Sequence, residues 1–77
     1  MEDPRAYVRI ADLLRQQITA GQIKAGQPVP SITTLTQDHG VARQTAAKAL
    51  QMLESEGLVY RVPGLGYYVI EHQPPGS

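Results

Sequence analysis

Residues 30–57 have the sequence PSITTLTQDHGVARQTAAKALQMLESEG, which predicts two helices separated by a turn. Ser31 has the character of a helix N-cap, and Gly40 that of a C-cap, so a short helix precedes a longer one that begins at Arg43. At about 3.6 residues per turn, the longer helix has an apolar face and a polar, small-residue face. The first face contains Ala46, Ala49, Leu50 and Leu53, and the second contains Gln44, Ala47, Lys48, Gln51 and Ser55. This layout is typical of a helix-turn-helix unit, although an ordinary helical hairpin with a solvated outer face has the same repeat.

The segment after Gly57 favours that first interpretation. Residues 58–62 and 67–70 are rich in β-branched and aromatic side chains, and the turn sequence PGLG lies between them at 63–66. A two-stranded hairpin is only marginally stable alone, so we expect it to pack on the helices through Leu58, Val62 and Val69. The predicted fold is α+β and mainly α: a winged helix-turn-helix with three helices and a C-terminal β-hairpin wing.

The remaining helix is predicted upstream, from residue 4 to about residue 20, with Asp3 as N-cap and Pro4 as its first residue. Its inner stripe consists of Tyr7, Ile10, Ala11, Leu14 and Ile18. Between this helix and residue 30 we expect a loop in which Val29 pairs briefly with the wing. Residues 1–72 are expected to form one domain, and 73–77 a flexible tail or linker.

Composition excludes several classes of protein. The chain has 77 residues, seven basic and seven acidic side chains, and no cysteine, which excludes a disulfide framework and suits the cytosol. No apolar run is long enough to cross a bilayer, and no signal peptide is apparent. No catalytic motif appears, and neither His39 nor His72 has partners at metal-ligand spacing. We therefore expect no enzyme activity, cofactor or metal, and a cytoplasmic location.

The start of the longer helix carries side chains suited to DNA. The hydroxyls of Ser31, Thr33 and Thr45 lie near helix N-termini, where they and the backbone N–H groups can contact phosphate. Arg43 matches the two acceptors on a guanine edge, and Gln44 can pair with adenine. Each can equally be an ordinary surface residue: a solvated charge at Arg43, an exposed amide at Gln44, a first-turn hydroxyl at Thr45.

Further candidate contacts lie at the margins of this surface. Lys48 is expected to meet a phosphate or the rim of the groove, and Arg61 to reach a neighbouring phosphate from the wing, unless it only protects a strand edge. Gly64 would let the wing backbone approach the minor groove closely. The balanced net charge predicts few phosphate contacts and weak, salt-sensitive binding.

Together these pieces resemble the N-terminal winged-helix DNA-binding domain of GntR-type bacterial transcription regulators. The resemblance is carried, in order, by Tyr7, Ile10, Leu14, Ile18, Gly21, Ala25-Gly26, Pro30-Ser31, Leu35, Gly40-Val41, Arg43, Thr45, Ala49-Leu50, Leu53, Glu56-Gly57-Leu58-Val59, Gly64-x-Gly66 and Val69. It implies that Arg43 is the arginine typical of the recognition-helix start, that Thr45 is the threonine that follows it, and that Gly64 is the DNA-contacting glycine of the wing.

Three positions depart from the pattern that the resemblance implies. Thr33 stands where such domains usually have a DNA-contacting arginine, and Ala47 where a second recognition-helix arginine is common. Ala42 replaces the usual serine or threonine cap, which is worth about 1 kcal/mol. These departures leave the fold intact and bear on affinity and operator sequence.

The function that the resemblance implies is sequence-specific binding of double-stranded DNA by a transcription regulator, most often a repressor. Two copies are expected on an inverted-repeat operator, as a homodimer formed on DNA or through a C-terminal domain that these residues do not contain. The alternative is a winged helix that binds another protein through the outer face of residues 44–55. The uncharged Ala47 and the low net charge favour this alternative, whereas Arg43 and the glycines of the wing favour DNA.

Overall fold

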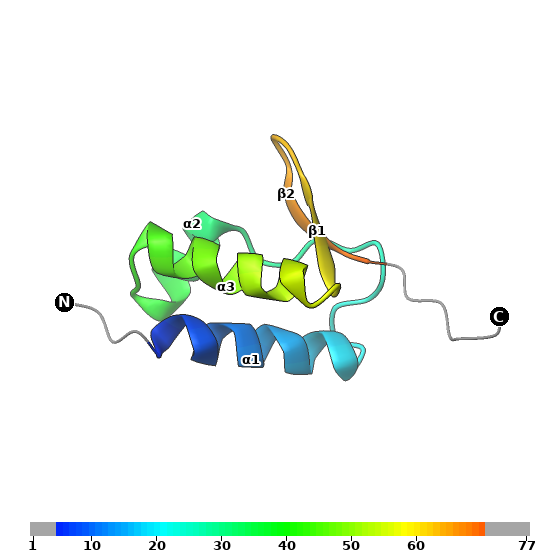
Figure 1. Ribbon diagram of the computed structural model, residues 1–77, viewed down its shortest axis with the longest axis horizontal. Helices are drawn as coiled ribbons and strands as arrows, with labels where there is room; N and C mark the ends of the chain where they lie inside the picture. The colour runs from blue at the N-terminus through cyan, green and yellow to red at the C-terminus, as the bar shows by residue number, and fades with distance from the viewer. Residues whose placement is uncertain (1–4, 71–77) are drawn as a thin grey trace, which may run out of the picture.

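The computed structural model describes residues 5–70, which fold into three helices and one antiparallel pair of strands. The elements are α1 (Ala6–Thr19), α2 (Ile32–His39), α3 (Arg43–Ser55), β1 (Val59–Val62) and β2 (Gly66–Val69). The predicted winged helix-turn-helix architecture is therefore confirmed (Figure 1). Among residues 5–70, no helix is both long enough and apolar enough to cross a membrane.

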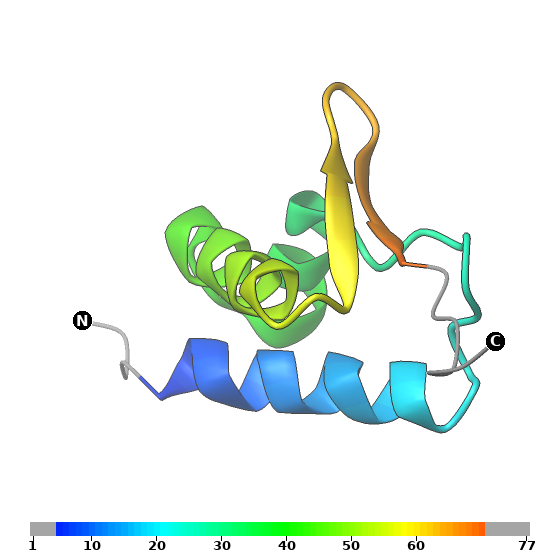
Figure 2. The same ribbon diagram turned by 45° about the vertical axis from the view of Figure 1, so that its right-hand side comes forward.

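The three helices and the wing are arranged so that one face of α3 is turned away from α1. Helix α1 runs along one side of α3, and the hairpin projects from the opposite side, beyond the C-terminal end of α3 (Figures 1 and 2). Helix α2 lies next to α3 at the other end. The face of α3 that is turned away from α1 is thus bordered by α2 and by the wing.

Local sequence accounts for the turn between α2 and α3. Ser31 is the N-cap of α2, and its Oγ accepts a hydrogen bond from the backbone N–H of Thr34 at 3.1 Å. Gly40 ends the helix in the left-handed conformation, with φ of 64°, and its N–H donates to the Thr36 carbonyl at 2.9 Å. Glycine adopts such a φ without steric cost, so it allows the chain to reverse here. Helix α3 then begins at Arg43, as predicted.

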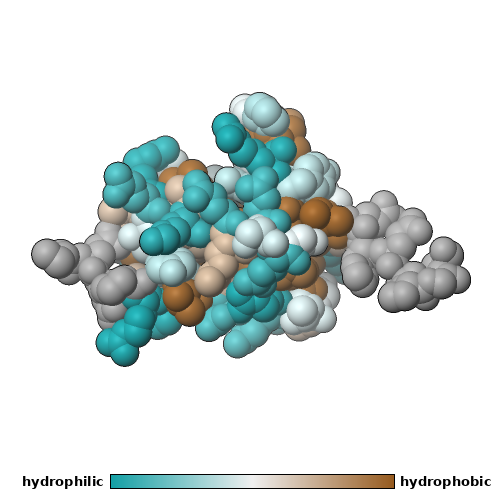
Figure 3. All heavy atoms as spheres, viewed as in Figure 1, coloured by the Kyte–Doolittle hydropathy of each residue, from teal (hydrophilic) through white to brown (hydrophobic). Residues whose placement is uncertain are grey.

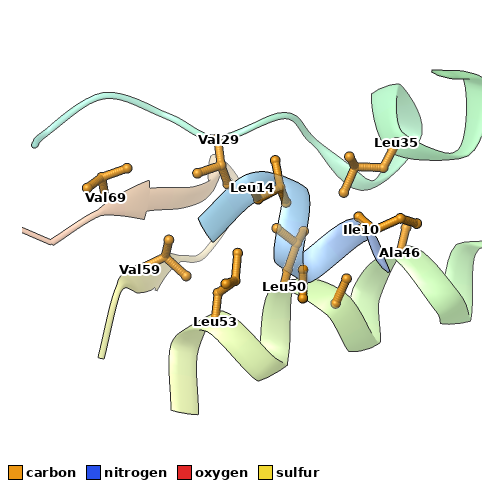
Figure 4. Close-up of a cluster of buried hydrophobic side chains, with 11 residues drawn as sticks. Ile10, Leu14, Val29, Leu35, Ala46, Leu50, Leu53, Val59 and Val69 are labelled. Atoms are coloured by element: carbon orange, nitrogen blue, oxygen red, sulfur yellow. The ribbon is translucent and has the colours of Figure 1, made fainter. Parts of the chain in front are cut away.

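The core is built from one face of each helix and from the base of the wing (Figure 4). The four predicted inner residues of α3, Ala46, Ala49, Leu50 and Leu53, are all buried. They meet Ile10, Ala11 and Leu14 of α1 and Leu35 of α2, together with Val29, Val59 and Val69. Tyr7 and Ile18, which we expected to be part of the inner stripe, are only half-buried at its margin.

The wing differs from the prediction in its bounds and in one anchor. The first strand, β1, starts one residue later than predicted, at Val59, and ends at Val62 as predicted. The second strand is shifted by one residue: Val62 pairs with Gly66, so β2 begins at Gly66 and ends at Val69. Val62 was wrongly expected to pack on the helices. Successive strand residues point to opposite faces, so Val62 lies on the face opposite Val59, which is buried. Val59 and Val69 face each other and hold the wing to the core, and Leu58 packs at its edge.

The loop before α2 supplies a third backbone segment beside the wing. The N–H of Val29 donates to the Tyr67 carbonyl at 3.0 Å, and the N–H of Val69 donates to the Gln27 carbonyl at 2.9 Å. This confirms the expected pairing of Val29. Because β2 is hydrogen-bonded on both sides, the hairpin is held more firmly than two strands alone would be.

Helix α1 begins at Ala6 with Arg5 as its N-cap and ends at Thr19. The predicted cap Asp3 and first residue Pro4 lie outside the described residues, as does the predicted tail at 73–77.

An ion pair that the sequence patterns did not indicate joins α1 to the end of α3. The guanidinium of Arg15 donates from Nε and Nη2 to the two carboxylate oxygens of Glu56, at 2.8 and 2.7 Å, and also bonds Asp12. The hydrogen bonds from Arg15 lower the pKa of Glu56. In turn, its bonds to Glu56 and then to Asp12 raise the pKa of Arg15 above its ordinary value.

This ion pair should make folding stability depend on pH. Because the pKa of Glu56 is lower in the folded chain than the ordinary value of 4.5, its contribution to stability is present above that value. It disappears as the pH falls through the folded-state pKa. Glu56→Gln is expected to lower the free energy of unfolding by about 0.2–1 kcal/mol at pH 7, since both side chains are about one-third exposed to solvent. Urea denaturation at pH 7 and at pH 3 measures the effect.

The control for this prediction is Glu54→Gln, which removes the same charge two residues away and outside the pair with Arg15. It should change the free energy of unfolding little at either pH. The difference between wild type and Glu56→Gln should be smaller at pH 3 than at pH 7, because pH 3 lies below the ordinary pKa of 4.5, where the contribution of the ion pair to stability declines. An equal loss at both pH values would contradict the electrostatic explanation.

Candidate nucleic-acid interface

The start of α2 carries exposed hydroxyls that differ in their hydrogen-bond partners. The Ser31 hydroxyl caps the helix and also donates to Thr34 Oγ1 at 3.0 Å. Ser31 is therefore occupied in holding the helix start, while the exposed Thr34 hydroxyl keeps its own proton to donate. Thr34 was not among the predicted contacts, although its position three residues after an N-cap serine is the spacing at which such side chains meet.

The start of α3 is exposed and lies within reach of α2. Arg43 and Gln44 are both exposed, and Thr45 is half-buried. Arg43 Nη1 donates to Thr33 Oγ1 at 3.4 Å, a long hydrogen bond that connects the first turns of the two helices. The structure thus brings Thr33 and Arg43 together. Ala42 is in an extended conformation and makes no side-chain cap bond, as its alanine side chain requires.

Lys48 lies toward α1 and away from the centre of the outer face of α3. Its Nζ lies 4.7 Å from the centre of the Tyr7 ring, in a cation–π contact between α3 and α1. Such a contact at an exposed site is worth about 0.5–1 kcal/mol, so it holds the ammonium only loosely. This placement agrees with a contact at the rim of a groove and is far from ideal for reading bases at its centre.

The wing presents Arg61 and Gly64 in two different settings. Arg61 is exposed but lies on the same face of the hairpin as Val59 and Val69, because residues two apart along a strand share a face. Its guanidinium therefore projects on the helix side of the wing, beyond the core. Arg61 stays a predicted contact to a neighbouring phosphate, with protection of the strand edge as the alternative.

Gly64 has a conformational role that is independent of any ligand. Pro63 and Gly64 occupy the middle of a turn that is closed by a 3.0 Å hydrogen bond from the Leu65 N–H to the Val62 carbonyl. Gly64 has φ of 82°, as the third residue of a type II turn requires. A Cβ at Gly64 would have no neighbour within 4 Å, so the backbone angle is what demands glycine here.

The wing and the start of α2 border one open hollow. It has a volume of about 760 Å³, and Ser31 and Thr34 from α2 line it together with Leu65 and Tyr68 from the wing. The wing tip and the phosphate-binding candidates of α2 therefore face a common space. Hydrophilic residues cover much of the face seen in Figure 3, with hydrophobic patches that include the upper part of the hairpin.

The charges near the first turns of α2 and α3 favour an anion, although the net charge of the chain is zero. Neither α2 nor α3 has an acidic residue in its first turn, where the helix dipole is positive. Glu54 and Glu56 lie at the far end of α3, about 18 Å from Arg43 at the usual rise of a helix. Glu56 is also neutralised by Arg15.

Within residues 5–70, no three His, Cys, Asp or Glu side chains are grouped closely enough to hold a metal ion.

Comparisons with known proteins agree with this arrangement. The family described as "Bacterial regulatory proteins, gntR family" matches residues 6–69. The mannosyl-D-glycerate transport/metabolism system repressor MngR of Escherichia coli (strain K12) is 36% identical over 67 residues, which are 87% of this chain and 28% of MngR. The HTH-type transcriptional repressor NagR of Bacillus subtilis (strain 168) is 36% identical over 63 residues, 82% of this chain and 26% of NagR.

A solved structure extends the likeness to three dimensions. The crystal structure of AraR(DBD) in complex with operator ORR3 matches with a TM-score of 0.80 and 36% identity, over 83% of this chain and 77% of that chain. This chain spans less than a third of the length of the two curated repressors, and the matched part is the winged helix-turn-helix. The match to the family and the match to a solved structure agree, so the chain belongs to the GntR family of bacterial regulatory proteins.

Proposed function

We propose that this domain binds double-stranded operator DNA and acts in transcription regulation, as a repressor. In this proposal α3 enters the major groove from Arg43, and the wing enters the adjoining minor groove near Gly64. The observation that carries it is the exposed start of α3, where Arg43 and Gln44 stand beside Thr33 of α2 with no acidic residue in either first turn. The family is one of regulatory proteins and not of enzymes.

The proposed roles divide between positioning and sequence recognition. Thr33, Thr34 and Thr45 contact phosphates near two helix N-termini, and Ser31 supports them by capping α2. Arg43 and Gln44 read base edges. Lys48 and Arg61 contact phosphates on the two borders of the groove, one beside α1 and the other on the helix side of the wing. This arrangement needs no cofactor.

A single domain of this size offers few base contacts, so we further propose that two copies bind an inverted repeat. The relatives named as repressors, and the domain solved with an operator, support the regulatory role. A regulator of bacterial operators acts where the chromosome lies, so we also propose a cytoplasmic location for this chain.

Titration of the isotope-labelled chain with random-sequence duplex DNA at low salt tests the proposal. Backbone amide shifts are expected for residues 31–48 and for the wing at 61–66, and they should reverse as salt is added, because phosphate contacts release counterions. The solvent-exposed side of α1 around Leu13 serves as an internal control and should not shift. Silence at residues 31–48 and the wing would instead favour the winged helix as a protein-binding module.

A further inference from the structure

The tip of the wing is apolar and exposed. Residues 62–66, VPGLG, contain no charged side chain and no side-chain hydrogen-bonding group. Leu65 is 69% exposed, compared with 41% for Leu13 and 45% for Tyr60, the other exposed large hydrophobic residues of the part described. The core at the base of the wing is already filled by Val59 and Val69, so Leu65 contributes nothing to it.

The tip is also held in place. The type II turn fixes Leu65 through its N–H bond to Val62, and Gly66, with φ of 116°, leads directly into β2. Below it, the rings of Tyr60 and Tyr68 pack with their centres 6.2 Å apart on one face of the stem. Since β2 is bonded on one side to β1 and on the other to the loop at residues 26–29, the stem is anchored through β2. A turn whose backbone is already ordered can present Leu65 to a ligand at a small cost in backbone entropy.

We propose that Leu65 packs on the floor of the minor groove and makes the domain prefer A·T to G·C pairs at that place. This inference rests on the proposed function, because it needs the wing to lie in the minor groove. An apolar side chain at the tip cannot bond base edges, so it can discriminate only through the groups it covers. Apolar side chains of minor-groove-binding proteins do enter this groove, where they often insert between base steps.

The chemistry of the groove floor determines the direction of the preference. A·T and T·A pairs present only acceptors there, whereas G·C adds the guanine N2 amino group, which protrudes and must donate a hydrogen bond. Leu65 has no acceptor for that donor. Covering a G·C pair would therefore strip water from the amino group without replacing its bond, which is unfavourable. Gly64 and Gly66 have no Cβ, so neither adds side-chain bulk beside Leu65 at the tip.

The test uses inosine, which lacks the N2 amino group but keeps the major-groove edge of guanine. A duplex is first selected from a random pool with the full chain. Each A·T pair in it is then replaced, one at a time, with G·C or with I·C, and dissociation constants are measured at fixed salt. Where Leu65 lies, G·C should bind about 5-fold more weakly than I·C, as expected for a single unfavourable base pair. Where α3 reads the major groove, G·C and I·C should weaken binding equally.

Leu65→Ala should bring the ratio between G·C and I·C close to one at that pair. The matched control Leu13→Ala removes an exposed leucine from α1, far from the wing, and should leave the ratio unchanged. A ratio near one at every pair in the wild type would overturn the inference. A ratio that persists in Leu65→Ala would also overturn it, because another group would be reading the amino group.

The failure of this inference is distinguishable from that of the proposed function. If pairs are found at which G·C and I·C are equally unfavourable but none at which they differ, α3 reads DNA and the role of Leu65 is refuted. If the random pool yields no bound duplex at all, the DNA-binding proposal itself is wrong, and the role of Leu65 falls with it.

Discussion

Replacing Arg43 with alanine is expected to weaken binding of the selected operator by roughly 5- to 150-fold, the equivalent of one bidentate contact to guanine at about 1–3 kcal/mol. The same change should also relax the base preference at one position, because the alanine side chain cannot distinguish base pairs there. Arg43 is exposed at the first turn of α3, and its bond to Thr33 is long, so little is lost when the side chain turns toward DNA. Competition binding with operator and random duplexes measures both effects.

Two variants separate the role of Arg43 from that of a general positive charge. Arg43→Lys keeps the charge but not the planar fork, so it should retain affinity for random DNA and lose discrimination. Lys48→Ala should weaken operator and random DNA alike and flatten the salt dependence, because its ammonium lies at the rim, over Tyr7. The assignment of these roles would be refuted if Arg43→Ala and Lys48→Ala lowered specific and random binding by equal factors.

Leu53→Ala is expected to leave the domain largely unfolded at room temperature. Leu53 is completely buried, and truncation of such a leucine costs about 2–5 kcal/mol through lost burial and the cavity that remains. A single core in a chain of this size rarely supplies more than about 3–5 kcal/mol in total. Leu53 also lies where α3 meets the wing: its carbonyl accepts a 3.1 Å bond from the Leu58 N–H. Circular dichroism during urea denaturation measures the loss.

Leu13→Ala is the matched control for core truncation as well. The side chain of Leu13 is 41% exposed, and it is not a member of the core cluster, so its removal should change the free energy of unfolding by less than about 0.5 kcal/mol. If both variants unfolded at the same urea concentration, the core identified from burial would not be what stabilises the fold.

Much of the fold was predictable because its signals are local. Ser31, Gly40 and the apolar repeat from Ala46 to Leu53 fix the two helices and the turn between them within a short span of chain. Strand register is less local. Val62 and Val59 both suit a buried strand position by type, and only the pairing with Gly66 and Val69 determines which of them faces the core.

The candidate site was predictable to a smaller extent. The exposed position of Arg43 and Gln44 follows from the helical repeat, since they lie outside the apolar face. The partners of these residues do not follow from it. The bond from Arg43 to Thr33, the contact of Lys48 with Tyr7 and the ion pair of Arg15 with Glu56 each join residues on different helices. No periodicity along one helix indicates them.

The sequence alone was sufficient to determine which segments are helices, where α2 and α3 begin, and that a hairpin follows the last helix. Helix caps, turn glycines and a period of about 3.6 act between neighbours in the chain, so their effect is present before any tertiary contact forms. The tertiary structure determined which hydroxyl of α2 is left to donate, which face of the wing carries Arg61, and that Leu65 remains in solvent at a firmly held tip. These outcomes depend on the packing of α1, α3 and the hairpin against one another, because side-chain partners are chosen by proximity in space.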